Sequence, residues 1–157
     1  MGWFNSHLHQ FRVGNARFGM THDEFGGPLD TEDSFDENDY RLSELGLRPK
    51  SKFNYEYDFG DSWEHLIVLE KVLPPQPGFV PVCLKGARAC PLEDSGGPWG
   101  YADKLAIIAD PDHPEHEEIA EWMGTDFDPE TFNLKAINRH LASLAASWKS
   151  RRRPRRG

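Results

Sequence analysis

The sequence predicts an α+β fold, in which an antiparallel β-sheet is followed by C-terminal helices that pack on one of its faces. Two observations support this prediction. Strand-like alternation of apolar and polar residues fills the first half of the chain, and helix-like apolar spacing fills the second half. The sequence has no internal repeat and no dividing linker, so we expect one domain over residues 1–149 and a basic disordered tail over 150–157.

The first expected element is a β-hairpin over residues 8–18. Gly14 and Asn15 separate two apolar stretches, and both residues tolerate the positive φ of a two-residue turn. Residues 21–39 follow as a long acidic loop, whose length makes it either a solvated segment or a candidate lid.

A second hairpin is expected over residues 52–73. Phe53, Tyr55 and Tyr57 alternate with polar residues, which is the pattern of a half-buried strand. The segment Phe59–Ser62 predicts a turn, and the chain is expected to return as a strand from Trp63 to Leu73.

Helices are expected over residues 101–109 and 114–123 and from residue 134 to the tail. Gly124 suits the C-terminal end of the second helix, and Asn133 can cap the third. The third helix has an apolar stripe at helical spacing, formed by Leu134, Ile137, Leu141, Leu144 and Trp148.

Charge is distributed unevenly over the 157 residues. The net charge is −8, but five arginines lie in Arg151–Arg156, so the rest of the chain has 13 basic and 26 acidic residues and a charge of −13. An acidic body repels phosphate backbones, so nucleic acid is expected as a partner only through the tail, which is otherwise a solvated terminus.

Compartment and membrane association follow from the composition. No apolar run is long enough to span a membrane, and the N-terminus lacks the pattern of a signal peptide. Two cysteines are too few for a disulfide framework, so we expect a cytoplasmic protein in a reducing environment.

Four stretches carry a family resemblance. They are MGW with HLHQF near the N-terminus, YEYDFGDSWEH at 55–65, CLKGARACPLEDSGG at 83–97 and DPDHPEH at 110–116. The chain resembles the plasmid pRiA4b ORF-3-like family, some of whose members are labelled TnpR-like passenger proteins of insertion elements. The resemblance covers residues 1–142. It implies a prokaryotic protein found on chromosomes or mobile elements, without a settled activity, and the residues give no support to a resolvase.

The resemblance also implies a truncation. In similar proteins the Met-Gly-Trp stretch is internal and follows a strand and a helix, whereas here it starts at Met1. We therefore expect a sheet that lacks one strand and has a bare edge, which favours low stability or aggregation.

One candidate chemical site is the turn that contains Asp58, Asp61 and His65. Carboxylates and imidazole are ligands of divalent metals and also general acids and bases. The alternative is structural, because Asp and Gly are ordinary turn residues.

A second candidate site contains Cys83 and Cys90. Two thiolates could form half of a zinc site, completed by His65, His113 or His116, although zinc signatures more often contain closely spaced pairs. Buried structural thiols and a redox pair are the alternatives.

The loop with Glu93, Asp94, Gly96 and Gly97 is a candidate ligand-binding loop. Its acids would attract a cation, and its glycines allow a close backbone approach, but it also serves as the entry to a helix. His7 and His9 are two residues apart, which makes them either a ligand pair on one strand face or two ordinary strand residues.

Four functions are compatible with these residues. The favoured hypothesis is a non-enzymatic binding or accessory domain associated with mobile elements. The alternatives are a metal-dependent hydrolase that uses Asp58, Asp61 and His65 with Glu93 or Asp94, a structural zinc protein, and a DNA-binding protein that uses the tail. No cofactor is certain, and a divalent metal such as zinc is the candidate.

Overall fold

The computed structural model of the chain describes residues 2–20 and 33–150. The chain forms two compact units. Unit 1 comprises Met1–Leu73 and Pro91–Thr125, and unit 2 comprises Pro74–Cys90 and Asp126–Gly157. Each unit is described by itself below. The predicted tail lies outside the described residues, apart from residue 150.

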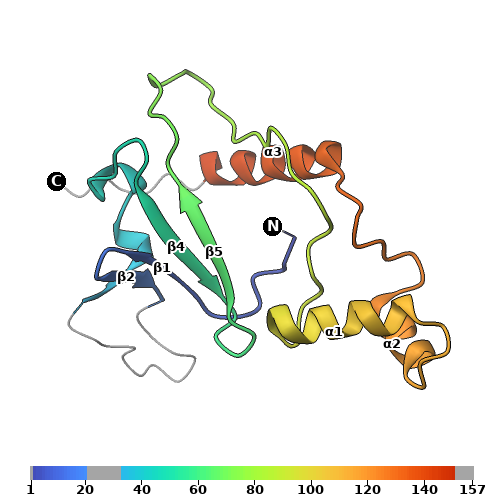
Figure 1. Cartoon of the computed structure of the whole chain (residues 1–157). Helices are drawn as coiled ribbons and strands as arrows, with labels where there is room; N and C mark the ends of the chain where they lie inside the picture. Colours follow the sequence, from blue (N-terminus) through green and yellow to red (C-terminus); the bar gives the residue numbers. More distant parts are fainter. Residues whose placement is uncertain (1, 21–32, 151–157) are drawn as a thin grey trace. The chain divides into compact units, whose positions relative to one another are not determined.

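Unit 1 contains a five-stranded sheet in the order β3-β2-β1-β4-β5 (Figure 1). Its strands are β1 (His9–Val13), β2 (Ala16–Gly19), β3 (Ser34–Asp36), β4 (Lys52–Tyr57) and β5 (Trp63–Val68). All neighbouring strands are antiparallel except β2 and β3. The α+β prediction is confirmed, with the correction that the sheet is mixed.

Both predicted hairpins are present, but the second is shorter than expected. The first turns at Gly14 and Asn15, and Gly14 has a φ of 62° as a two-residue turn requires. The strand expected from Trp63 to Leu73 ends at Val68. Its partner strand β4 begins only at Lys52, because the backbone just before it is left-handed, with a φ of 77° at Lys50. Beyond Leu69 the returning chain therefore has no strand beside it.

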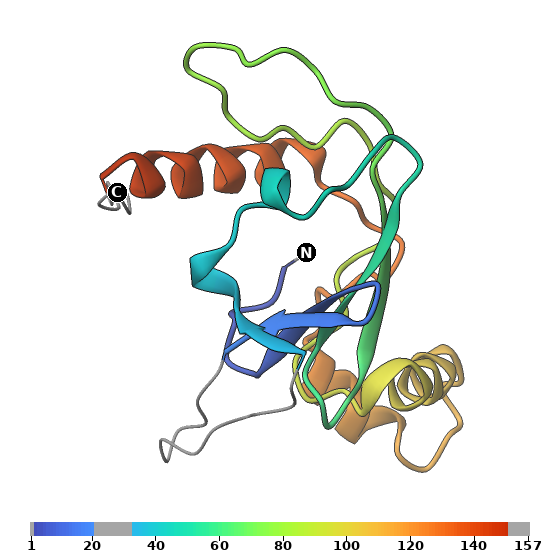
Figure 2. The same cartoon turned by 90° about the vertical axis from the view of Figure 1, so that its left-hand side faces the viewer.

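Strand β3 lies within the segment predicted as an acidic loop. It pairs with β2 over three residues, and the chain then passes through two short 3-10 helices, Glu37–Asp39 and Leu42–Glu44, before it reaches β4 (Figure 2). The remainder of the predicted loop, residues 21–32, lies outside the described residues.

One face of the sheet is aromatic. The registers place a set of apolar and ring side chains opposite one another on this face, as the alternation of a strand requires. We call it the aromatic face; its members are His9, Phe11, Val13, Phe18, Phe35, Phe53, Tyr55, Tyr57, Trp63, His65 and Ile67. Phe18, Phe53 and Tyr57 are its buried members.

The opposite face of the sheet is mostly polar. Gln10 donates a hydrogen bond to Glu56 at 2.7 Å, and Arg12 pairs with Glu64. Two faces of such different polarity identify the aromatic face as the one that forms the core.

The helices of unit 1 are α1 (Gly97–Ala109) and α2 (His116–Met123). Helix α1 begins four residues earlier than predicted, with Pro98 in its first turn, where a missing N–H is tolerated. Helix α2 begins two residues later than predicted, but it ends at Met123 with Gly124 as its C-cap, as predicted, and it buries Met123. The indole ring of Trp63 meets the ring of Tyr101 on α1 at 6.1 Å.

Unit 2 contains α3 (Leu134–Ser150). The predicted cap is confirmed, because the side-chain oxygen of Asn133 accepts a hydrogen bond from the Ala136 N–H at 2.9 Å. Asn138 on α3 bonds both the N–H and the carbonyl of Cys83, at 2.7 and 3.0 Å. These two bonds fix the extended segment that contains Cys83 along the helix.

None of the helices in the described part of the chain is both long enough and apolar enough to cross a bilayer.

Candidate functional site

The turn between β4 and β5 is organised by Asp58. Its Oδ1 accepts hydrogen bonds from the N–H groups of Gly60 and Asp61, at 3.0 and 3.3 Å. Asp58 and Ser62 both have positive φ, at 57° and 52°. The local hydrogen bonds of a short carboxylate side chain stabilise this left-handed conformation, which explains an aspartate at this position.

This turn lies against the loop that precedes α1. Asp61 Oδ2 accepts a hydrogen bond from the Gly96 N–H at 3.0 Å. A Cβ atom on Gly97 would lie 2.2 Å from the carbonyl oxygen of Asp61, so this approach requires a glycine. We call the contact between residues 58–62 and residues 91–97 the turn–loop junction.

Glu93 joins the junction to the sheet and to the N-terminal segment. Its carboxylate accepts hydrogen bonds from the Tyr57 hydroxyl at 2.9 and 3.1 Å and from the Phe4 N–H at 2.8 Å. The Trp3 indole donates to the Pro91 carbonyl at 2.9 Å and stacks on Tyr57 with ring centres 4.7 Å apart. Residues 3–7 are therefore held across the junction.

His7 is the residue on which the acidic groups converge. Its Nδ1 lies 3.6 Å from Asp58 Oδ2, and its Nε2 lies 3.3 Å from Asp94 Oδ1 and 3.8 Å from Glu93 Oε2. His7, Asp58 and Asp94 can each offer one ligand atom within 4.8 Å of the others. This set, with Glu93 beside it, is the only group of three or more possible metal ligands among the described residues; we call it the acidic cluster.

In the part of the chain that the structure describes, the acidic cluster has no lysine or arginine partner. Across residues 2–20 and 33–150, no lysine or arginine forms an ion pair with its three carboxylates. Lys104 comes near the loop, but its ammonium group donates to the Ser95 carbonyl at 3.1 Å and lies 5.3 Å from the centre of the Trp122 ring. Among the described residues, His7 is the one basic side chain in contact with these carboxylates.

The structure brings most of the predicted site residues together at the junction and leaves His65 apart from them. Asp58, Asp61, Glu93, Asp94, Gly96 and Gly97 all belong to the junction, although the sequence separates them into two motifs. His65 does not join them: it lies on the aromatic face, where its Nδ1 is 3.3 Å from the Tyr55 carbonyl and its ring is 5.5 Å from that of Trp3.

The two N-terminal histidines have different surroundings. His7 lies in the acidic cluster, whereas His9 Nε2 contacts the Glu37 carboxylate at 3.1 Å. The hydrogen bond to Glu37 raises the pKa of His9 above its ordinary value, and the partial burial of the ring opposes this increase. Burial, with nearby negative groups, raises the pKa of Tyr55.

The other predicted metal ligands have local roles. The Cys83 thiol contacts the Lys85 carbonyl at 3.4 Å, and Cys83 and Cys90 are not joined by a disulfide. His116 Nδ1 lies 3.2 Å from the Ile107 carbonyl, and His113 Nδ1 accepts from the Glu115 N–H. In the described part of the chain, no cluster of metal ligands includes a cysteine, and the zinc site on these thiols stays a prediction.

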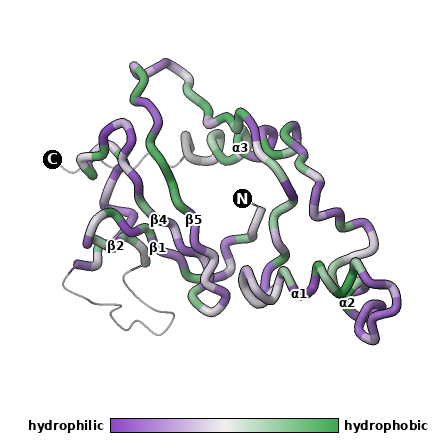
Figure 3. The backbone as a smooth tube through the Cα atoms, viewed as in Figure 1, coloured by the Kyte–Doolittle hydropathy of each residue, from purple (hydrophilic) through white to green (hydrophobic). Residues whose placement is uncertain are grey.

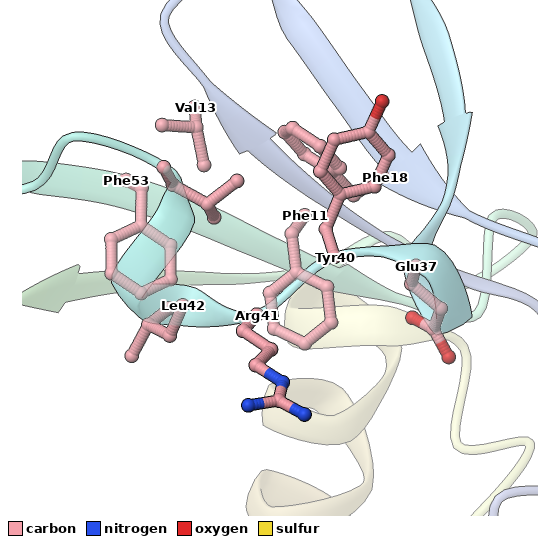
Figure 4. Close-up of a pocket in the computed structure, with 9 residues that line it drawn as sticks. Phe11, Val13, Phe18, Glu37, Tyr40, Arg41, Leu42 and Phe53 are labelled. Atoms are coloured by element: carbon pink, nitrogen blue, oxygen red, sulfur yellow. The ribbon is translucent and has the colours of Figure 1, made fainter. Parts of the chain in front are cut away.

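A small pocket opens on the aromatic face. The rings of Phe11, Phe18 and Phe53 contribute to its wall, and Glu37 and Arg41 supply charged groups (Figure 4). Its volume of about 130 Å³ is below the several hundred Å³ typical of organic ligand sites. This pocket is therefore too small for an ordinary organic ligand.

The fold and the junction together define a class of α+β protein in which a hairpin turn and a helix-entry loop form one acidic site. The chain belongs to the plasmid pRiA4b ORF-3-like proteins, whose family model matches residues 1–136. This result confirms the resemblance drawn from the motifs.

The chain is also similar to two individual proteins. It is 40% identical over 157 residues to the uncharacterized protein y4hQ of Sinorhizobium fredii (strain NBRC 101917 / NGR234), a match that covers 98% of this chain and 78% of that protein. It is also similar to the crystal structure of the protein of unknown function MM3350 from Methanosarcina mazei Go1. That match has a TM-score of 0.73 and 35% identity, and covers 87% of this chain and 75% of the other.

Proposed function

We propose that this protein is a non-enzymatic binding domain and that its acidic cluster binds one divalent cation. The observation that carries the proposal is the convergence of His7, Asp58 and Asp94, whose ligand atoms lie within 4.8 Å of one another. Atoms at this spacing can contact one ion at ordinary metal–ligand distances of about 2.0–2.6 Å.

Electrostatics supports a cation. Three carboxylates close together repel one another, and a bound divalent ion replaces this repulsion with attraction. Asp58 uses Oδ1 for the turn, which leaves Oδ2 on the side of His7. One imidazole nitrogen with carboxylate oxygens suits Zn²⁺ or Mn²⁺ better than Ca²⁺, which prefers ligands made up of oxygen alone.

The remaining acids of the junction support binding over catalysis. Asp61 is engaged with the Gly96 N–H, and Glu93 with the Tyr57 hydroxyl and the Phe4 N–H. These carboxylates act as positioning residues, because their hydrogen bonds hold the loop against the turn.

The biological setting is also part of the proposal. The plasmid in the family description supports an accessory role associated with mobile elements. Two cysteines that form no disulfide support a reducing, cytoplasmic environment.

Titration calorimetry with Mn²⁺ and Zn²⁺ on chelator-treated protein tests the proposal. We expect one ion per chain, and at least a tenfold weaker affinity in Asp58→Asn and Asp94→Asn, since each variant loses one charged ligand. Asparagine keeps the turn acceptor of Asp58 and tolerates the positive φ of both positions, so these variants should fold.

The matched control is Asp110→Asn. Asp110 Oδ1 also accepts a hydrogen bond in a turn, from the Asp112 N–H at 3.1 Å, but it lies outside the acidic cluster. Binding should be unchanged in this variant. Equal loss in Asp110→Asn, or the absence of binding in the folded parent chain, would overturn the proposal.

A cysteine double variant separates the second metal hypothesis. Zn²⁺ binding that is lost in Cys83→Ser/Cys90→Ser and kept in Asp58→Asn would assign the ion to the thiols instead of the acidic cluster.

A further inference from the structure

The two compact units have charges of opposite sign. Unit 2, which comprises residues 74–90 and 126–157, has ten basic and three acidic residues and a charge of +7. Unit 1 has eight basic and 23 acidic residues and a charge of −15. Salt screens exposed charges beyond about 10 Å at 0.1 M, so the charge of the local surface decides which partners approach unit 2, and not the net charge of the chain.

The positive charge of unit 2 is concentrated on α3 and the residues that follow it. Helix α3 contains no acidic residue, and all three acids of unit 2 precede it. Glu130 pairs with Arg88 at 3.1 Å, and Asp128 accepts two hydrogen bonds within its own turn. The sequence continues from α3 into Arg151–Arg156, so residues 134–157 include eight basic residues and no acid.

Two of these basic residues lie on one exposed face of α3. Lys135 and Arg139 are four residues apart, which places them one turn apart on the same side of the helix, and both are exposed. Together with Asn138 and Ala142 they line an open hollow of about 560 Å³. Within the described residues, no carboxylate forms an ion pair with either cationic group, so the face keeps its positive charge.

The segment that contains Lys85 adds a third cation beside the start of α3. Asn138 bonds the N–H and the carbonyl of Cys83. A Cβ atom on Gly86 would lie 2.2 Å from the ring of Phe132, so Gly86 packs directly against the residue two positions before the helix. Lys85 lies between these two contacts and is exposed. The basic surface therefore includes the extended segment as well as the helix.

The opposite face of α3 is occupied by packing. Ile137 and Leu141 lie on the side of the helix away from Lys135 and Arg139 and are half-buried, and Ala145, one turn beyond Leu141, is only 5% exposed. Figure 3 shows hydrophobic and hydrophilic residues alternating along α3. A helix that binds a membrane surface inserts its apolar face into the lipid, so a packed apolar face favours a hydrophilic polyanion over a bilayer.

We propose that unit 2 binds the phosphate backbone of a nucleic acid through the face of α3 that contains Lys135 and Arg139, together with Lys85. Guanidinium and ammonium groups are the usual protein partners of phosphate, and the helix presents them without a neighbouring acid. This binding is separate from the ion proposed for the acidic cluster, which belongs to unit 1. Contacts to phosphate carry no sequence information, so binding should not depend on base sequence.

Fluorescence anisotropy with a labelled DNA duplex of about 20 base pairs tests the inference on the whole chain. We expect a dissociation constant of about 1–100 μM at physiological salt. In Lys135→Gln/Arg139→Gln, binding should be about tenfold weaker or more, and the slope of log K against log salt should fall by about 1.8, since each lost phosphate contact removes about 0.9. Glutamine is a good helix former, so this variant should fold.

The matched control is Arg48→Gln/Lys52→Gln. These two residues are also exposed but belong to unit 1, so the control removes the same charge from the chain and should leave the salt slope unchanged. All titrations contain a chelator, which separates this binding from that of the proposed cation. Equal binding of an RNA duplex would support the same contact, because RNA presents the same phosphodiester backbone.

Three outcomes would overturn the inference. The first is no binding to either duplex at about 50 mM salt and 100 μM protein, with or without binding to vesicles that contain phosphatidylserine. The second is an equal loss of affinity in the two double variants. The third is binding that deletion of residues 151–157 abolishes but Lys135→Gln/Arg139→Gln leaves unchanged, which would assign the contact to the tail alone.

Discussion

The turn–loop junction and the aromatic face of the same sheet are held by different kinds of interaction. At the junction, directional hydrogen bonds join residues far apart in sequence, such as Tyr57 to Glu93 and Gly96 to Asp61. On the aromatic face, ring contacts dominate, for example Phe18 with Phe35 at 5.4 Å and Phe11 with Tyr55 at 4.8 Å.

The two kinds of interaction differ in how much structural change they tolerate. A hydrogen bond weakens when its atoms move by a few tenths of an ångström, whereas apolar packing tolerates side-chain changes that conserve volume. The junction is therefore expected to be geometrically strict, and a single methyl group placed there should matter more than elsewhere in unit 1.

The largest effect is expected from Gly97→Ala. The added Cβ would lie 2.2 Å from the Asp61 carbonyl oxygen, and the backbone has a φ of 68°. Separation of the loop from the turn should lower the free energy of unfolding by roughly 3 kcal/mol or more. Chemical denaturation monitored by tryptophan fluorescence measures this difference.

Gly14→Ala is the control for backbone conformation. Gly14 has a φ of 62°, close to that of Gly97, but a Cβ there would meet nothing within 4 Å. Its cost should be about 1 kcal/mol, from φ alone. Equal losses in the two variants would show that the junction is no stricter than an ordinary hairpin turn.

A smaller effect is expected from Tyr57→Phe. The Tyr57 side chain is almost fully buried, at 1% exposure, and its hydroxyl donates to the Glu93 carboxylate. Removing a donor to a charged group should cost about 1.5–3 kcal/mol while the ring contact with Trp3 remains. Thermal or urea unfolding of the purified variants provides the measurement.

Tyr40→Phe is the matched control on the aromatic side of the sheet. Tyr40 is 40% exposed and contacts Phe18 and Phe35 through its ring. The Tyr40→Phe variant should lose no more than about 0.5 kcal/mol of unfolding free energy. A Tyr57→Phe variant as stable as Tyr40→Phe would mean that Glu93 finds other donors and that the junction does not depend on this bond.

Local sequence patterns predicted the parts of the fold that local physics determines. The Gly14–Asn15 turn, the alternation around Tyr55 and the Asn133 cap all depend on residues within a few positions of one another, and all are present. Strand β3 was missed because three residues carry no periodic signal and its parallel pairing with β2 is non-local.

Which residues meet at the junction depends on the pairing of strands that are far apart in the sequence. His7 enters the acidic cluster because the Asp58 N–H bonds the Leu8 carbonyl at 2.8 Å, which extends the pairing of β1 with β4. No local motif contains this information. His65 faces the aromatic side because it pairs with Tyr55 across the hairpin, and that parity follows from the length of the turn.

The smallest effect is a pH dependence that originates on the aromatic side. The hydrogen bond to Glu37 raises the pKa of His9 above its ordinary 6.5 in the folded protein. The protonated ring therefore contributes stability that is fully present below pH 6.5 and is lost as the pH rises through the raised pKa. The pKa of Tyr55 is raised from 10.0, so its hydroxyl stays protonated throughout this window.

The measurement is the difference in unfolding free energy between the parent chain and Glu37→Gln at a series of pH values from 5 to 9. The parent should lose its advantage as the pH rises, because the variant lacks the carboxylate that favours the imidazolium form. Glu117→Gln in the first turn of α2 is the control, and its difference from the parent should be flat. A pH-independent difference for Glu37→Gln would mean that the His9–Glu37 contact does not depend on the charge of the histidine. The aromatic face would then be stabilised by packing alone.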